Sequence, residues 1–229
     1  MASGQFSLFG MGLRFRVALM LAAVVMLFAI TPAQRQKTPA AAKPVAAGGH
    51  TFTVTPAQSR ITLTLTQEGM IRVRYPRHLV AVKSFSGTIN APGDDESKAV
   101  VDVQAEAKSL VNIDEKMSDF ERRDFQKILH GNVLESERHP ALRFRSVSIT
   151  DFRTSGETQT LTLHGDLTLH GATRRVSFPV SLTRKNEQLR ASGETRIRQT
   201  DFGMTPYSGA LGSIKIGNEI KVSFEITAK

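Results

Sequence analysis

The chain has 229 residues and contains neither cysteine nor tryptophan. The absence of cysteine excludes disulfide bonds, thiolate metal sites and a cysteine nucleophile. The sequence also lacks the G-x-S-x-G, H-E-x-x-H, P-loop and G-x-G-x-x-G motifs of common hydrolases and nucleotide-binding enzymes. Its six histidines are scattered, and no pair has the spacing that places two metal ligands on one helix face. These absences predict a protein that is not an enzyme and that carries no cofactor and no metal ion.

Acidic residues are absent from the first fifty positions, which carry five basic residues. The remainder has 25 basic and 21 acidic residues, so its net charge is only +4, although the whole chain carries +9. Binding to nucleic-acid phosphates needs basic residues concentrated on one face of a domain. We therefore expect no nucleic-acid partner.

The basic residues Arg14 and Arg16 precede fourteen uninterrupted apolar residues, Val17 to Ile30, and then Thr31-Pro32-Ala33. Fourteen helical residues span about 21 Å, which is less than the roughly 30 Å hydrocarbon core of a membrane. The pattern favours a cleaved secretory signal peptide over residues 1–33, with an uncleaved membrane anchor as the alternative. Both predict a periplasmic or otherwise extracytoplasmic location.

Residues 34–50 are rich in Ala, Pro and Gly and contain no large apolar side chain. Such a segment cannot bury a core, so we expect a disordered linker before a folded domain at 51–229.

Alternating apolar and polar residues dominate the predicted domain. Examples are ITLTLT from Ile61, VSFPVSL from Val176 and EIKVSFEI from Glu219. Strict alternation indicates strands with one buried and one wet face, and short turn-forming segments between them favour antiparallel pairing. Residues 114–130 break the pattern, with Met117, Phe120 and Ile128 at helical spacing. We predict an all-β protein, a closed barrel of about eight antiparallel strands with one short helical excursion.

The segment LTLHGDLTLHG, Leu161 to Gly171, contains the same five residues twice. Along one strand the leucines share a face, while His164, Asp166 and His170 share the other. The two histidines would lie roughly 20 Å apart, too far to bind one metal ion. We interpret them as polar residues on the wet face, with a local contact between His164 and Asp166 as an option.

Several segments, in this order and spacing, resemble the YceI-like family of exported lipid- and polyisoprenoid-binding proteins. They are TVTPAQSRITLTL, FSGTI, VLESERHPALRFRS, GDLTLHGATRRVSFPV, DFGM and IGNEIKVSFEITA. The resemblance runs from about Thr51 to Lys229. It implies a lipocalin-like barrel with a helical excursion and a long apolar tunnel that holds an isoprenoid chain, with the polar head near the mouth.

The residues expected to face inward are all aliphatic or Phe, and none is a carboxylate. Such a face either forms a tunnel for a long-chain isoprenoid, a quinone or a fatty acyl lipid, or fills a dry core. In the second case the protein would be a scaffold that docks on a membrane complex. The candidate lining residues are Leu63, Leu65, Phe85, Ile89, Val101, Val103, Leu142, Phe144, Leu161, Leu163, Leu167, Leu169, Val176, Phe178, Val180, Leu182, Val222 and Phe224.

The densest basic cluster of the predicted domain is RVRYPRH, which contains Arg72, Arg74 and Arg77. Its arginines are candidates for binding a diphosphate head group or an anionic membrane surface. The alternative is a solvated edge strand whose charges protect it against aggregation.

Overall fold

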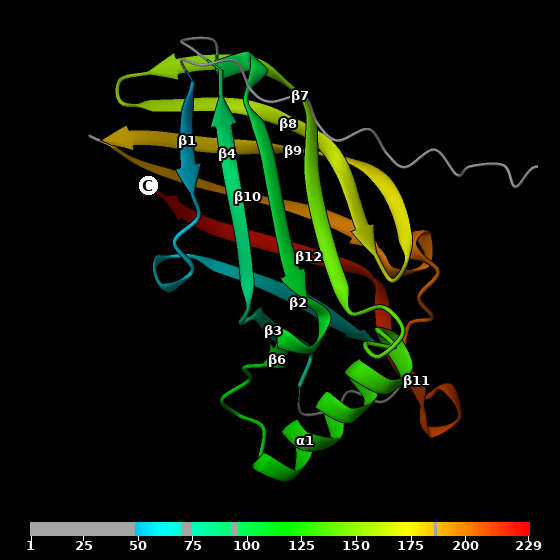
Figure 1. Cartoon of the computed structure of the whole chain (residues 1–229). Helices are drawn as coiled ribbons and strands as arrows, with labels where there is room; N and C mark the ends of the chain where they lie inside the picture. Colours follow the sequence, from blue (N-terminus) through cyan, green and yellow to red (C-terminus); the bar gives the residue numbers. More distant parts are fainter. Residues whose placement is uncertain (1–48, 70–74, 93–95, 186) are drawn as a thin grey trace, which may run out of the picture. The chain divides into compact units, whose positions relative to one another are not determined.

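The computed structural model describes residues 49–69, 75–92, 96–185 and 187–229. Twelve strands form one curled antiparallel sheet, a half-barrel (Figure 1). They are β1 (His50–Thr53), β2 (Arg60–Glu68), β3 (Arg77–Val82), β4 (Phe85–Ala91), β5 (Val100–Glu106), β6 (Leu110–Asn112), β7 (Ala141–Ser155), β8 (Thr158–Leu169), β9 (Ala172–Lys185), β10 (Gln188–Arg198), β11 (Ser208–Gly209) and β12 (Ile214–Ala228).

The antiparallel all-β fold is confirmed, but the prediction of about eight strands was wrong. The additional strands are short: β1, β6 and β11 have four, three and two residues. Segments of that length carry too little alternation to be recognised in a sequence, because they form only by pairing with longer neighbours.

The sheet order is β1-β4-β5-β7-β8-β9-β10-β12-β2-β3-β6, with β11 beside β12. Strand β1 pairs with β4, and the residue after it, Val54, forms a bridge to Ala228 at the end of β12. Thr53 and Lys229 exchange two backbone hydrogen bonds of 2.6 and 3.0 Å. The N-terminal strand therefore joins two distant strands and curls the sheet around its apolar face.

The predicted helical excursion is confirmed as α1 (Asp119–Ile128), followed by a π-helical turn, Leu129–Val133. Ser118 caps the helix: its hydroxyl accepts a hydrogen bond from the Glu121 amide, while the Glu121 carboxylate accepts one from the Ser118 amide. Phe120, one of the three apolar residues at helical spacing, does not lie on a buried face of the helix, because it is 72% exposed.

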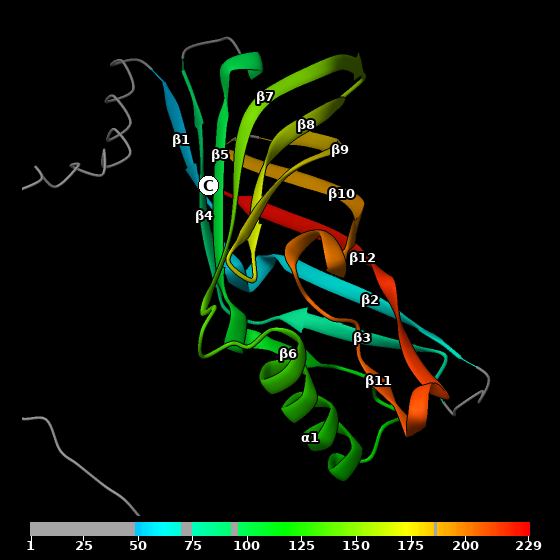
Figure 2. The same ribbon diagram turned by 90° about the vertical axis from the view of Figure 1, so that its right-hand side faces the viewer.

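Helix α1 lies beside β6, the last strand of the sheet order (Figure 2). The Gln126 amide oxygen accepts a hydrogen bond from the Asn112 amide at 3.0 Å, and its nitrogen donates one to the Leu110 carbonyl. One side chain thereby satisfies backbone groups of an edge strand that would otherwise be open for pairing. Among the described residues, no helix is long and apolar enough to cross a membrane.

The repeated LTLHG segment is used in two different ways. The first histidine, His164, lies within β8 and contacts the hydroxyl oxygens of Thr150 and Ser177 at 2.9 and 2.6 Å. Asp166 pairs with Arg175 of β9 and not with His164. The prediction that the second histidine, His170, lies on the wet face of a strand was wrong. With Gly171 it forms the two-residue turn between β8 and β9, and both residues have positive φ (51° and 74°).

Candidate functional site

A cavity of about 390 Å³ lies on the concave side of the sheet and is lined by 42 residues. All of them are apolar except His50, Arg143, Arg184, Thr195 and Gln199. The apolar lining follows from the alternation of the strands, which directs every second side chain inward. The cavity is therefore built from the residues that also form the protein core.

Of the eighteen residues predicted to face inward, all except Phe85 line the cavity. Phe85 is buried, but it packs in the core cluster that also contains Val54 and Leu110. It is the first residue of β4 and follows the turn from β3. Whether the lining residues bind a ligand remains a prediction.

Three phenylalanines on alternate strands of the sheet order, β7, β9 and β12, form one part of the wall. The ring centroid of Phe178 lies 5.4 Å from that of Phe144 and 5.6 Å from that of Phe224. Both spacings are typical of favourable tilted or edge-to-face aromatic pairs. Gly165 and Gly193 provide the space for the outer two rings, because a Cβ atom on either glycine would collide with the ring of Phe144 or Phe224.

One end of the cavity is covered by the segment after α1. Leu129, Val133 and Leu134 are buried and line this end, together with Leu169, the last residue of β8, and Met204. Gln199 also lies here and is fully buried. Its side-chain nitrogen donates to the Gly217 carbonyl at 2.8 Å, while its oxygen has no hydrogen-bond partner among the described residues.

The opposite end of the cavity contains two of the five polar lining residues, His50 and Arg184. His50 begins β1, and Arg184 lies near the end of β9. The Arg184 guanidinium lies over the Phe52 ring, 5.4 Å from its centroid, in a cation–π arrangement. Phe152, which is 38% exposed, also lines this end. The geometry gives a closed apolar end and a more polar, more exposed one.

The predicted basic cluster falls mostly outside the described residues, which do not include Arg72 and Arg74. Arg77, the first residue of β3, is exposed and does not line the cavity. Arg184 lines the cavity but was not predicted to face inward, although the sequence contains a pattern that indicates it. Arg184 continues the alternation of Val180 and Leu182, both of which were predicted to face inward.

The curled antiparallel half-barrel with an apolar cavity and one helical excursion defines a lipocalin-like class of architecture. Within that class, the chain belongs to the family of YceI-like domains, whose model matches residues 52–228. This confirms the resemblance noted in the sequence. No curated protein has a sequence that matches the chain.

Two solved structures share the fold. The crystal structure of BcnA from Burkholderia cenocepacia is 17% identical, with a TM-score of 0.59 over 77% of this chain and 99% of BcnA. A polyisoprenoid binding domain from Saccharophagus degradans, implicated in plant cell wall breakdown, is 11% identical, with a TM-score of 0.56 over 78% of this chain and 97% of that domain.

Proposed function

We propose that this protein is an exported binding protein that holds a long-chain isoprenoid, or a related quinone or fatty acyl lipid, in the apolar cavity. The observation that carries the proposal is the cavity itself, which is lined almost wholly by aliphatic and aromatic side chains. Ten buried methylene groups contribute about 8 kcal/mol, equivalent to a Kd of roughly 1 µM before the cost of immobilising the chain. No special chemistry is needed for such a ligand.

The alternative is a non-catalytic scaffold that docks on a membrane complex through its outer surface. That role needs only a filled core, so an apolar space of this size in the middle of the domain favours the binding protein. Similarity to a domain described as polyisoprenoid-binding supports the same choice.

The polarity of the two ends suggests how a ligand is oriented. The apolar tail would lie towards Leu129 and Leu134, and the head group would lie near Arg184 and His50. A guanidinium is suited to a carboxylate or diphosphate head group because it donates several charge-assisted hydrogen bonds.

We retain a second role for the basic segment that contains Arg72, Arg74 and Arg77, namely contact with an anionic membrane surface or head group. Replacing all three with Gln tests it. The variant should bind a diphosphate-headed lipid, or vesicles containing anionic lipid, more weakly than the unmodified chain. Unaltered binding of both would end this part of the proposal.

Mass spectrometry of lipid extracts tests the main proposal directly. Protein purified from its native compartment should release one long-chain isoprenoid or related amphiphile in a near-stoichiometric amount. A lipid-free extract together with no uptake of offered isoprenoids would overturn it.

N-terminal sequencing of the same material tests export: a new N-terminus near Ala33 is expected, and an intact Met1 would contradict cleavage.

A further inference from the structure

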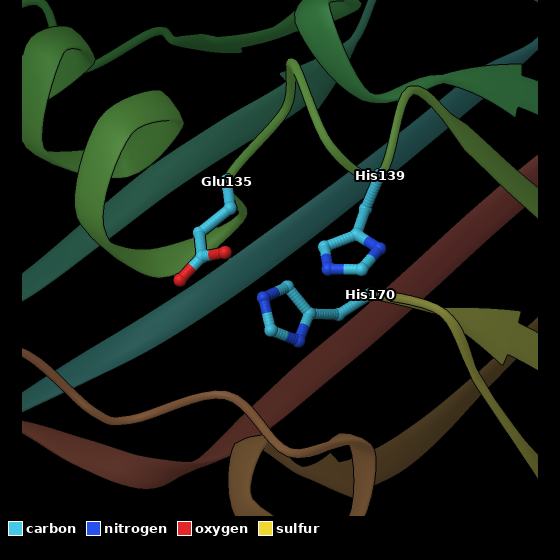
Figure 3. Close-up of side chains that lie close together, drawn as sticks. All are labelled: Glu135, His139 and His170. Atoms are coloured by element: carbon cyan, nitrogen blue, oxygen red, sulfur yellow. The ribbon is translucent and has the colours of Figure 1, made fainter. Parts of the chain in front are cut away.

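Three side chains from two segments that are far apart in the sequence meet beside the closed end of the cavity. Glu135 and His139 belong to the segment between the π-helical turn and β7, and His170 is the first residue of the β8–β9 turn. Each offers one ligand atom, and these atoms all lie within 4.8 Å of one another. Figure 3 shows the Glu135 carboxylate and the two imidazoles directed towards a common point.

We propose that Glu135, His139 and His170 form a binding site for a divalent metal ion, with Zn²⁺ as the preferred ion. Two imidazoles and one carboxylate are a frequent zinc ligand set, and imidazole is also suited to nickel and copper. Zinc bonds of about 2.1 Å in a tetrahedral arrangement place ligand atoms about 3.4 Å apart. Small side-chain rotations would bring the three atoms to that spacing.

The hydrogen bonding of His170 is the strongest support. Its Nδ1–H donates to the Phe202 carbonyl at 3.3 Å, which leaves Nε2 as the nitrogen with the free lone pair. Nε2 is buried and has no hydrogen-bond partner within the described part of the chain. Metal-binding histidines usually donate their other N–H to a carbonyl or carboxylate in this way. A buried nitrogen without a partner is costly, and a bound cation would remove that cost.

The positions of the other two ligands are fixed by their backbone. The Glu135 carbonyl accepts a hydrogen bond from the His139 amide at 3.0 Å, so the two side chains leave one tight turn. The His139 ring packs on Gly171, where a Cβ atom would come within 3.0 Å of it, and lies 4.2 Å from the His170 ring between centroids. Glu135 and His170 both have positive φ, a backbone state that such residues rarely adopt.

The Glu135 carboxylate also pairs with Arg138, whose Nη1 lies 2.7 Å from Oε2. This ion pair is exposed on the arginine side and therefore contributes little, so Arg138 does not prevent metal binding. A carboxylate has two oxygens, and one remains available while the other accepts from Arg138.

A metal ion at this site would join the segment that covers the closed end of the cavity to the β8–β9 turn. Leu134 and Leu169, the residues immediately before Glu135 and His170, both line the cavity. The ion would therefore hold the segment after α1 against the sheet at the closed end of the cavity.

Zinc binding to the full-length chain, carrying no added polyhistidine tag, tests the proposal by competition with a chromophoric chelator. One Zn²⁺ should bind per chain. The variant His170→Ala should bind at least about 100-fold more weakly, and Glu135→Gln about 10-fold more weakly. His164→Ala is the matched control, because His164 occupies the equivalent place in the first LTLHG segment and should leave the affinity unchanged.

Equal zinc affinity in the unmodified chain and in Glu135→Gln would overturn the proposal, as would the absence of a 1:1 complex. The Gln variant keeps the shape of the side chain, so it decides the question even where His170→Ala fails to fold. X-ray absorption of the zinc-loaded chain adds a direct readout. Two imidazole nitrogens at about 2.0 Å are expected, and a spectrum without imidazole ligands would contradict the site.

Discussion

The ring of Phe144 on β7 lies against Gly165 on β8, in the space that a side chain at position 165 would occupy. Gly165 has the same inward direction as the leucines on either side of it in LTLHGDLTLHG, and it is buried. The glycine that follows the first histidine therefore makes room for a ring of the cavity wall, whereas the glycine that follows the second belongs to a turn.

Gly165→Ala should destabilise the protein, because its Cβ atom would meet both the Phe144 ring and the backbone oxygen of Arg145. We expect a loss of about 1–3 kcal/mol in the free energy of unfolding, typical of overpacking in a close-packed wall. Urea denaturation checks this. Gly131→Ala is the control: no atom of the described residues lies within 4 Å of a Cβ atom there, so the free energy of unfolding should not fall. An equal loss in both variants would contradict the packing argument.

Arg184→Gln should weaken binding of an amphiphile with an anionic head group about 5- to 10-fold, since it removes the charged group at the more polar end of the cavity. Binding of the corresponding uncharged alcohol should change little. Fluorescence competition with a reporter lipid measures both. Arg190→Gln is the matched control, because Arg190 is exposed on the neighbouring strand and does not line the cavity. Equal losses for both ligands would show that Arg184 acts on packing and not on the head group.

The stability of the protein should depend on pH through His130. Burial lowers the pKa of His130 from its ordinary value of 6.5, with the carbonyl of Leu110 opposing the shift and Lys108 adding to it. The ring contacts Gln126 and the Ser136 hydroxyl. Because the folded state disfavours the proton, the contribution of His130 is complete above pH 6.5 and is lost as the pH falls through the lowered pKa.

The free energy of unfolding, measured in urea at pH 7.5 and pH 5, should therefore fall more on acidification for the unmodified chain than for His130→Gln. The Gln side chain does not titrate, and it can still form hydrogen bonds. Identical pH dependence in the two proteins would show that His130 carries no part of the acid sensitivity.

The long strands and most of the cavity wall were predictable, because alternation over five or more residues fixes which face is buried. Leu161 and Leu163 of β8, and Phe178 and Val180 of β9, follow this rule without exception. Helix α1 was predictable for a similar reason, because the apolar residues there no longer follow a period of two. Phe120 lies within α1, but it is five residues before Phe125, about 140° away around the helix axis, so it does not share the face that packs on the core.

What the sequence did not predict depends on contacts between distant segments. The pairing of Thr53 with Lys229 and the meeting of Glu135 with His170 follow from the curl of the sheet, which no local pattern encodes. The turn at His170 was also not predicted from the sequence. The same five residues continue a strand at Leu161–Gly165 but end one at Leu167–Gly171. Only the register of β8 and β9 distinguishes the two copies.

Binding of a long-chain isoprenoid by the protein and by its Leu163→Trp variant tests the central claim most directly. Leu163 is buried in the middle of the cavity wall, so an indole there would occupy the space of the ligand. Native mass spectrometry should show a 1:1 complex with the unmodified chain and with the control Phe120→Trp, whose side chain is exposed on α1, but none with Leu163→Trp. A complex of undiminished occupancy in a correctly folded Leu163→Trp variant would contradict the account, because the lipid would then lie somewhere other than in the cavity.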